Sequence, residues 1–407
     1  MINMLKRIFK LNKSDEKKCL VYIHDHKFKL SPDNKFYTDG KFTNELFNRY
    51  IFSDEDKIVV IARKVNIYEN FDDYNLVDHS QVKFSCVTGI NPIQIFINNI
   101  SINLFIFNII LKCNLIVIRL PSFLGLFCSL LCILYSKKYF IEVVGHARES
   151  LLDRNPSFIK KIFVNIYFKL TQFVVKRATG AIYVTKSALQ KDFPCSGINE
   201  YASNVILKID KKNNPKKNYT IIDTPKIGLI GSFNNHYKGI DFAIKTIAYL
   251  KNKRNLKVEL YILGHGTLLN EYQELARSLE VGDQVFFDGL LPLEQVSKWL
   301  DNLDIYIQPS LTEGLPRSLI EAMSRGLPCI ASNVGGIPEL LNKDMIFTDF
   351  DENIFSTMIE SLLSSYSDRE REGSENFKNS LEYEFEVLEL KRRNFWEKSR
   401  SIVMKGQ

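Results

Sequence analysis

Strand-like and helix-like segments alternate along most of this 407-residue chain, and the alternation limits the folds open to it. The clearest example begins at LDIYIQP (303–309), an apolar run typical of a buried strand that ends at a proline. Turn residues follow, and the spacing in RSLIEAMSRG predicts a helix over 317–325. A second buried strand, LPCIAS, and a second glycine-rich turn come next. This β-α-β-α pattern indicates an α/β fold with a parallel sheet.

The same alternation runs through both halves of the chain. The first half contains strand-like runs such as CLVYIHD, KIVVIAR and GAIYVT, and after a polar stretch, KKNNPKKN (211–218), the pattern starts again at PKIGLIGSF. Because 407 residues exceed one ordinary core, we expect two Rossmann-like α/β domains. The predicted organisation is a first domain over 1–205, a second over 206–380, and a C-terminal helix over 381–407 that could pack back on the first domain.

Composition narrows the class of protein. The net charge of +7 comes with no long Lys/Arg block, which argues against nucleic acid as a partner. The seven cysteines have no metal-site spacing and are predicted to be reduced, buried thiols. The start of the chain has no signal-peptide core, and the apolar run 115–135 is interrupted by Arg119 and Pro121, so we expect a strand and a helix there rather than a membrane span. These features predict a cytoplasmic protein.

Two glutamates in the opening motif indicate a ligand. Glu313 lies in the turn after a predicted strand, and Glu321 lies about one turn inside the following helix. In a parallel sheet, ligands bind beyond the carboxyl ends of the strands, where helix N-termini attract phosphate. Carboxylates at that place suit the hydroxyl groups of a sugar or a ribose, so the motif predicts a sugar nucleotide. The alternative is that Glu313 stabilises the helix dipole and Glu321 is only solvated.

The motifs of residues 225–342 resemble those of the donor domain of retaining nucleotide-sugar glycosyltransferases of family 4, also called group 1. The resemblance rests on IGLIGSF, YKGIDFAIKTI, ELYILGHG, VFFDGLLP and DIYIQPSLTEGLPRSLIEAMSRGLPCIASNVGGIPEL. It implies the GT-B fold, in which two Rossmann-like domains with parallel sheets face one another. The N-terminal half matches more loosely, through RLPSFLG, EVVGH and AIYVT, and resembles enzymes that build bacterial capsular or lipopolysaccharide chains.

The resemblance implies a reaction and a set of roles. A sugar would pass from a nucleotide sugar, most simply a UDP-sugar, to a saccharide or lipid-linked acceptor, with retention at the anomeric carbon. Glu313 would meet the transferred sugar, Glu321 the ribose, Lys238 the diphosphate, and His146 the donor sugar near the reacting carbon. The remaining donor-binding candidates are Ser232, Gly264, Gly266, Gly314, Leu315, Arg317 and Gly40.

Some of these residues also have a simpler interpretation. Ser232 stands where the family usually has an arginine, and Arg317 could compensate for it. Lys238 could be an ordinary loop lysine, and His146 a structural histidine. Gly264 and Gly266 let the backbone approach a nucleotide or simply form a tight turn. Residues 287–291 (FDGLL) resemble the segment that binds the base through backbone groups.

Rival functions and cofactors follow from weaker patterns. GLIGSF suggests a dinucleotide oxidoreductase but lacks the third glycine and the later acidic residue. A GT-B sugar-nucleotide epimerase and a non-catalytic nucleotide-sugar binding protein are two further rivals. Asp349 and Asp351 have the spacing of a metal-binding pair, but the GT-B family does not use one, so a solvated turn is expected and no metal cofactor is predicted.

The segment SFIKKIFVNIYFKLTQFVVKR (157–177) has five basic residues, five aromatic residues and no acidic residue. One interpretation is an interfacial helix on anionic lipid, which would hold the protein peripherally at the inner face of the membrane, near a lipid-linked acceptor. Such binding would strengthen with anionic lipid and weaken with salt. The second interpretation is a crossover helix that packs on the sheet with its lysines in water.

Overall fold

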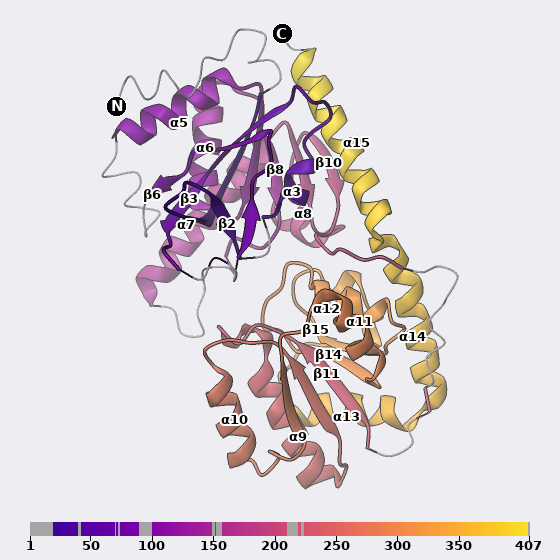
Figure 1. Cartoon of the computed structure of the whole chain (residues 1–407). Helices are drawn as coiled ribbons and strands as arrows, with labels where there is room; N and C mark the ends of the chain where they lie inside the picture. The colour runs from indigo at the N-terminus through magenta and orange to yellow at the C-terminus, as the bar shows by residue number, and fades with distance from the viewer. Residues whose placement is uncertain are drawn as a thin grey trace. The chain divides into compact units, whose positions relative to one another are not determined.

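The computed structural model describes residues 19–39, 42–69, 71, 74–88, 100–148, 151, 157–209, 219–220 and 224–405. The fold divides into two compact units (Figure 1). The N-terminal unit comprises residues 1–184, 189–202 and 389–407, and the C-terminal unit comprises 185–188 and 203–388. The sequence placed these boundaries at 205/206 and 380/381.

The N-terminal unit is built on a sheet whose central strands are all parallel. Its spatial order is β5-β3-β1-β7-β8-β9-β10, with the short strands β2 and β4 pairing antiparallel at the end of β1 and β6 pairing with β3. The strands are β1 (Cys19–Leu30), β2 (Phe36–Thr38), β3 (Lys57–Asn66), β4 (Asn75–Val77), β5 (Val82–Phe84), β6 (Val87–Thr88), β7 (Leu115–Leu120), β8 (Phe140–Val143), β9 (Gly180–Tyr183) and β10 (Ile198–Tyr201). The helices are α3 (Asn44–Asn48), α5 (Ile100–Lys112), α6 (Phe123–Leu134), α7 (Phe158–Arg177), α8 (Ala188–Asp192) and most of α15 (Phe385–Met404).

The apolar run 115–135 forms strand β7 and helix α6, as the sequence predicts. Helix α6 begins after Ser122, whose hydroxyl accepts the backbone N–H of Gly125, and the Asp25 carboxylate accepts the N–H groups of Phe123 and Leu124. These acceptors satisfy amide groups that every helix start leaves unpaired. Within the described residues, no helix is both long and apolar enough to cross a bilayer.

The C-terminal helix α15 packs on the N-terminal unit (Figure 1). Trp396 is fully buried and lies against Tyr50 and Phe140, with ring centroids 5.2 and 6.4 Å away. Arg400 forms an ion pair with the buried Asp56 at 2.9 Å. The helix begins at Phe385, after the short 3-10 turn η5 (Leu381–Tyr383), rather than near residue 380 as the sequence indicated.

The C-terminal unit contains a six-stranded, fully parallel sheet in the order β13-β12-β11-β14-β15-β16. Its strands are β11 (Lys226–Ile230), β12 (Glu259–Leu263), β13 (Val285–Gly289), β14 (Ile305–Gln308), β15 (Cys329–Ser332) and β16 (Ile346–Phe347). Its helices are α9 (Ile240–Arg254), α10 (Leu269–Ser278), α11 (Leu293–Asp301), α12 (Arg317–Met323), α13 (Glu352–Ser364) and α14 (Tyr366–Ser380), with the 3-10 turns η2 (His236–Lys238), η3 (Ile337–Glu339) and η4 (Lys343–Met345).

Both sheets have the strand order of the Rossmann fold. Numbered along the chain within each unit, and with the two-residue strand β6 left out, the first six parallel strands run 3-2-1-4-5-6 in space. The order reverses between the first and fourth strands, which are β1 and β7 in one unit and β11 and β14 in the other. Ligands of such sheets bind at this switch point, beyond the carboxyl ends of the strands. The predicted pair of Rossmann-like domains is confirmed.

Candidate functional site

The switch point of the C-terminal unit is formed by two loops. One follows β11 and leads through η2 to α9, and the other follows β14 and leads to α12. The loops are joined where the Leu311 N–H donates to the carbonyl of Tyr237 at 2.7 Å. Pro316 is the N-cap of α12 and Arg317 is its first helical residue, at the start that the sequence predicts. Two helix N-termini therefore begin at this edge of the sheet.

Lys238 and Glu313 meet at this edge, one from each loop. The Lys238 Nζ lies 2.6 Å from the Glu313 Oε1, and their side chains are 13% and 9% exposed. The stem of Lys238 lies against Gly231, where an added Cβ would be 2.9 Å from the lysine Cγ. A glycine at the end of β11 therefore lets the lysine stem pack close to the strand.

A buried polar network that the sequence analysis did not identify holds Glu313. The Glu313 Oε1 accepts hydrogen bonds from Ser310 at 2.8 Å and from the Gln308 amide at 3.2 Å. The amide oxygen of Gln308 in turn accepts the hydroxyl groups of Tyr306 and Ser318 at 2.9 and 3.0 Å. The available signal was a glutamine at the last position of an otherwise apolar strand, because a fully buried amide requires hydrogen-bond partners.

Glu321 occupies a different environment on α12. Burial raises the pKa of its carboxyl group, and the nearby Arg317 guanidinium partly offsets this effect. Within the described residues no donor to the Glu321 carboxylate is found, whereas Glu313 has three. Arg317 itself is exposed at the start of the helix. A partly buried carboxylate with unused acceptor capacity is a candidate for binding ligand hydroxyl groups.

The glycine candidates mark close contacts between loops. A Cβ on Gly264 would lie 1.8 Å from the Gly231 carbonyl oxygen, and one on Gly266, whose φ is +157°, would meet the backbone of Phe233 and Asn234. Gly264 and Gly266 therefore let the loops after β11 and β12 approach closely, and their contact with a nucleotide stays a prediction. Ser232 belongs to the loop after β11, and its hydroxyl accepts the Asn234 N–H at 3.3 Å.

Gly314 and Leu315 lie beside the glycine-rich turn after β15. The Gly314 carbonyl accepts the Gly336 N–H at 2.7 Å, and Leu315 is buried. Gly335 adopts a φ of +53°, and a Cβ there would lie 1.8 Å from the Glu313 carbonyl oxygen. The turn thus requires glycine both for its backbone conformation and for its approach to the Glu313 loop.

His146 belongs to the N-terminal unit. His146 stacks on Phe168 with ring centroids 5.4 Å apart, contacts Phe193, and places its Nε2 3.3 Å from the Asp192 carboxylate. These contacts fit the structural interpretation of His146, and its contact with a donor sugar stays a prediction. Gly40 lies outside the described residues.

A second polar cluster, also not identified from the sequence, lies at the switch point of the N-terminal unit. His24 and His26 occupy an irregularity in β1, and both rings stack on Phe42, at 5.1 and 4.3 Å. Arg119, from the end of β7, lies over the same Phe42 ring and pairs with the buried Glu142 at 3.2 Å. Burial lowers the pKa of His26 to about 4 and lowers that of His24 well below its ordinary range.

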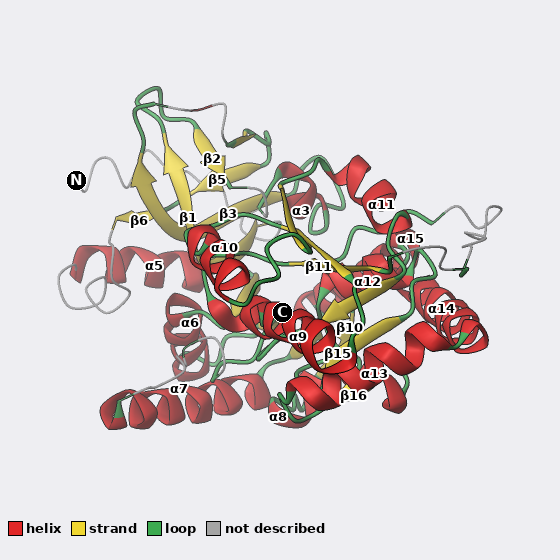
Figure 2. Cartoon of the chain, turned by 90° about the horizontal axis from the view of Figure 1, so that it is seen from below, coloured by secondary structure: helices red, strands yellow, loops and turns green. Residues whose placement is uncertain are grey.

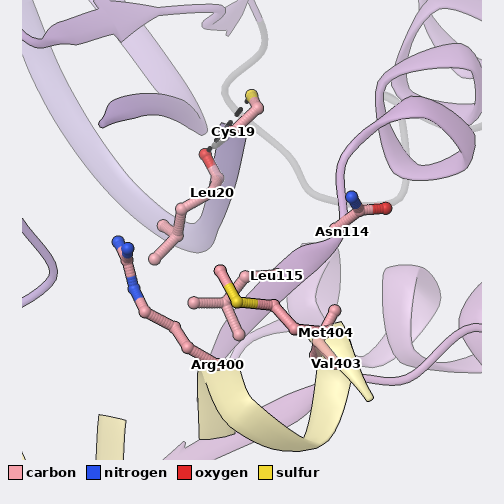
Figure 3. A pocket seen from close by; sticks show the side chains of 7 residues that line it. All are labelled: Cys19, Leu20, Asn114, Leu115, Arg400, Val403 and Met404. Atoms are coloured by element: carbon pink, nitrogen blue, oxygen red, sulfur yellow. Dashed lines mark hydrogen bonds between the residues drawn. The ribbon is translucent and has the colours of Figure 1, made fainter. Parts of the chain in front are cut away.

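Two further features are less suited to a ligand. Figure 3 shows a pocket at the amino ends of β1 and β7, away from the switch point, lined by Cys19, Leu20, Asn114, Leu115, Arg400, Val403 and Met404. Its volume of about 20 Å³ has room for about one water molecule. Asp351 of the DFD motif accepts the N–H groups of Asn353 and Ile354 and so caps α13. The described residues contain no cluster of three or more metal-ligating side chains.

Comparison with known proteins finds a relative of most of the chain and a family model that matches its C-terminal half. The family model "Glycosyl transferases group 1" matches residues 210–379. The protein CapJ of Staphylococcus aureus is 33% identical over 375 residues, which cover 92% of this chain and 93% of CapJ. The amylovoran biosynthesis glycosyltransferase AmsK of Erwinia amylovora is 35% identical over 114 residues, 26% of this chain and 28% of AmsK.

Solved structures share the fold at low sequence identity. Sucrose-phosphate synthase from Thermosynechococcus elongatus has a TM-score of 0.65 at 13% identity, covering 95% of this chain and all of that one. HepE of Anabaena, solved in complex with UDP and glucose, has a TM-score of 0.61 at 12% identity, covering 94% and 99% of the two chains. These similarities confirm the GT-B fold, and the family match favours a transferase over an epimerase or a non-catalytic binding protein.

Proposed function

The chain belongs to the group 1 glycosyltransferases, and on that premise we propose that it is a retaining enzyme of family 4 that moves a sugar from a nucleotide sugar to a saccharide or lipid-linked saccharide. The synthesis of a surface polysaccharide, such as capsule or lipopolysaccharide, is the proposed setting, supported by the similarity to AmsK, whose name refers to amylovoran biosynthesis. UDP is the proposed nucleotide, supported by the fold shared with HepE, which was solved with UDP and glucose. The proposal rests mainly on the Lys238–Glu313 pair at the switch point.

The two glutamates suit different parts of the donor. Glu321 has free acceptor capacity and would bind the ribose hydroxyl groups. Glu313 is held by Ser310 and Gln308, and it would bind hydroxyl groups of the transferred sugar without changing its own position. Gly314, Leu315 and the loops around Ser232, Gly264 and Gly266 would shape the walls of the donor site.

In the proposed chemical step, Lys238 has the largest role, which is to stabilise the leaving group. As the bond between the anomeric carbon and the phosphate oxygen breaks, negative charge accumulates on the departing diphosphate. The Lys238 ammonium, the Arg317 guanidinium and the amide groups at the starts of α9 and α12 would stabilise that charge. The acceptor hydroxyl would attack the same face that the phosphate leaves and give its proton to a phosphate oxygen, so retention requires no protein nucleophile.

We propose that transfer needs no bound metal ion. The charge of the diphosphate can be offset either by a bridging cation or by cationic side chains and helix amide groups, and the site offers the second kind. Activity in the presence of EDTA tests this point. Loss of activity that Mn²⁺ or Mg²⁺ restores would contradict it.

The N-terminal unit is the proposed acceptor domain. His24, His26 and Arg119 offer neutral rings and a guanidinium at its switch point, where a saccharide could bind. His146 remains a candidate for contact with the donor sugar near the reacting carbon. We place the enzyme in the cytoplasm, at the inner face of the membrane when the acceptor is lipid-linked.

A donor screen tests the proposal. Thermal melting with UDP-, GDP- and dTDP-sugars should identify one donor that raises the melting temperature, and Glu321→Gln should reduce that increase. Release of free nucleotide should then require an acceptor, and NMR of the product should show the anomeric configuration of the donor. Nucleotide-sugar binding without acceptor-dependent release would contradict transfer, and an inverted product would contradict retention.

A further inference from the structure

Helix α7 packs against the rest of the N-terminal unit through one face only, as a crossover helix does. The buried residues on that face are Val164, Tyr167, Phe168, Thr171, Val174 and Val175. Helix α6 lies alongside, and Phe123 at its start contacts Tyr167 with ring centroids 4.7 Å apart (Figure 2). Apart from Phe163, whose ring also lies 5.8 Å from that of Phe123, the apolar residues elsewhere on α7 are not explained by these contacts.

A second set of apolar residues lies on the outward side of α7, and we call it the outer stripe. It consists of Phe158, Ile159, Ile162, Phe163, Ile166, Leu170 and Phe173, each between 36% and 79% exposed. At about 100° per residue, all except Phe158 fall within an arc of about 100°. Single exposed apolar residues are common on protein surfaces, but a continuous stripe along four helical turns marks a binding surface.

The charges of the helix indicate what binds there. Helix α7 contains five basic residues and no acidic residue. Lys169 and Lys176 border the outer stripe on one side, and the Arg177 guanidinium lies 3.9 Å from the centre of the Phe173 ring at its end. Apolar side chains bordered by lysine and arginine match the boundary of an anionic bilayer, where acyl chains meet phosphate groups.

We propose that α7 is an interfacial helix whose outer stripe inserts into the acyl boundary of an anionic membrane while its basic residues contact lipid phosphates. A second copy of the chain is a less suitable occupant, because two such helices packed through the same stripe would bring their basic borders together. The proposal goes beyond the transfer reaction and does not depend on it. It also differs from binding by charge alone, because insertion of apolar side chains is not screened by salt.

Co-sedimentation of the full chain with vesicles of equal parts phosphatidylcholine and phosphatidylglycerol tests the proposal. Ile162→Ser combined with Ile166→Ser should reduce the partition coefficient on the order of 100-fold, because two side chains lose their apolar burial. The matched control is Ile206→Ser with Leu390→Ser, which changes two exposed aliphatic residues elsewhere and should bind like wild type. All three proteins should melt at similar temperatures, since the changed side chains are exposed.

A second measurement separates insertion from adsorption. A tryptophan introduced by Ile166→Trp should shift its fluorescence to the blue on vesicle addition and be quenched by brominated lipid. Changing Lys161, Lys169 and Lys176 together to glutamine should weaken binding at low salt while leaving the binding that persists at high salt. Equal vesicle binding by the stripe variant and wild type, or a change in oligomeric mass in place of vesicle binding, would overturn the proposal.

Discussion

The ammonium of Lys238 lies 2.6 Å from the Glu313 carboxylate, and both side chains are largely withdrawn from water. The same carboxylate oxygen also accepts hydrogen bonds from Ser310 and Gln308. The two charged groups therefore hold one another in place at the switch point of the C-terminal unit. This arrangement makes their contributions to stability and to transfer measurable separately.

Replacing Lys238 should affect transfer more than folding. Lys238→Met removes the cation proposed to face the departing diphosphate, so kcat should fall on the order of 100-fold or more. Lys238→Arg keeps the charge and should retain part of the activity. Steady-state kinetics with the identified donor measure both effects. Near-normal kcat in Lys238→Met would remove the lysine from the proposed mechanism.

The energetic coupling of the pair can be tested without substrate. Lys238→Met leaves Glu313 with two neutral donors, and Glu313→Gln leaves a largely buried ammonium without its carboxylate, so each change should lower stability. The double variant should be more stable than the sum of the single effects predicts, by a coupling free energy of about 1 to 3 kcal/mol. Urea unfolding of the four proteins gives this value, and strict additivity would mean that the contact contributes no stability.

Glu321→Gln should stabilise the unliganded protein while weakening donor binding. Burial raises the pKa of the Glu321 carboxyl, so its ionised form destabilises the fold at pH 7. A neutral amide removes that cost, and the melting temperature at pH 7 should rise. The difference from wild type should disappear as the pH falls below the unfolded pKa of 4.5, because the carboxyl is then protonated in both states. A lower melting temperature at pH 7 would indicate a stabilising partner for the carboxylate.

The pattern of strands and helices in the C-terminal unit could be predicted from sequence, because the signals there are local. Pro309 marks the end of an apolar strand, Gly326 marks the end of the following helix, and the helical spacing between them is clear. Glu313 and Glu321 could also be named from their place after a strand of a parallel sheet, and Lys238 from the family resemblance. Their roles in transfer stay predictions.

What the sequence missed depends on contacts between distant segments. The network of Gln308, Ser310 and Ser318 forms only when the β14 loop and α12 come together, and the cluster of His24 and Arg119 requires β1 and β7 to be neighbours. The outer stripe of α7 was hidden for a related reason. Composition gives the number of apolar residues, but only packing decides which of them face inward.

Acid should destabilise the N-terminal unit through its two buried histidines. Burial is the main cause that lowers their pKa values, to about 4 for His26 despite the nearby Asp39, so both rings are neutral in the fold at pH 7. As the pH falls, the two histidines therefore bind protons in the unfolded chain before they do so in the fold. Their contribution to stability is full above about pH 6.5 and is lost as the pH falls toward 4. Between pH 7 and pH 5, protonation of His26 in the unfolded chain should lower the free energy of unfolding by about 2 kcal/mol.

The matched variant for this pH effect combines His24→Asn and His26→Gln. The amide at position 24 can accept the backbone N–H of residue 26 in place of the His24 ring nitrogen, and the amide at position 26 can hydrogen-bond to the Thr38 hydroxyl in place of the His26 Nε2. Its melting temperature should change less than that of wild type between pH 7 and pH 5. Parallel melting curves for the two proteins over this range would show that other groups dominate acid sensitivity.

The buried amide of Gln308 lies at the centre of the polar network, and two substitutions separate its contributions. Gln308→Met leaves the hydroxyl groups of Tyr306 and Ser318 without their acceptor, which should lower the free energy of unfolding by about 1 to 3 kcal/mol at any pH near neutrality.

Gln308→Glu keeps that acceptor but places a second carboxylate beside Glu313, where the amide nitrogen of Gln308 lies 3.2 Å from the Glu313 Oε1. Two carboxylates at this distance raise the pKa of the pair, so the fold is least affected where they share a proton. The penalty of Gln308→Glu should therefore be small near pH 4.5 and grow as the pH rises toward 7, whereas that of Gln308→Met should stay constant. Thermal melting across this range distinguishes the two, and a pH-independent penalty for Gln308→Glu would mean that its side chain turns away from Glu313.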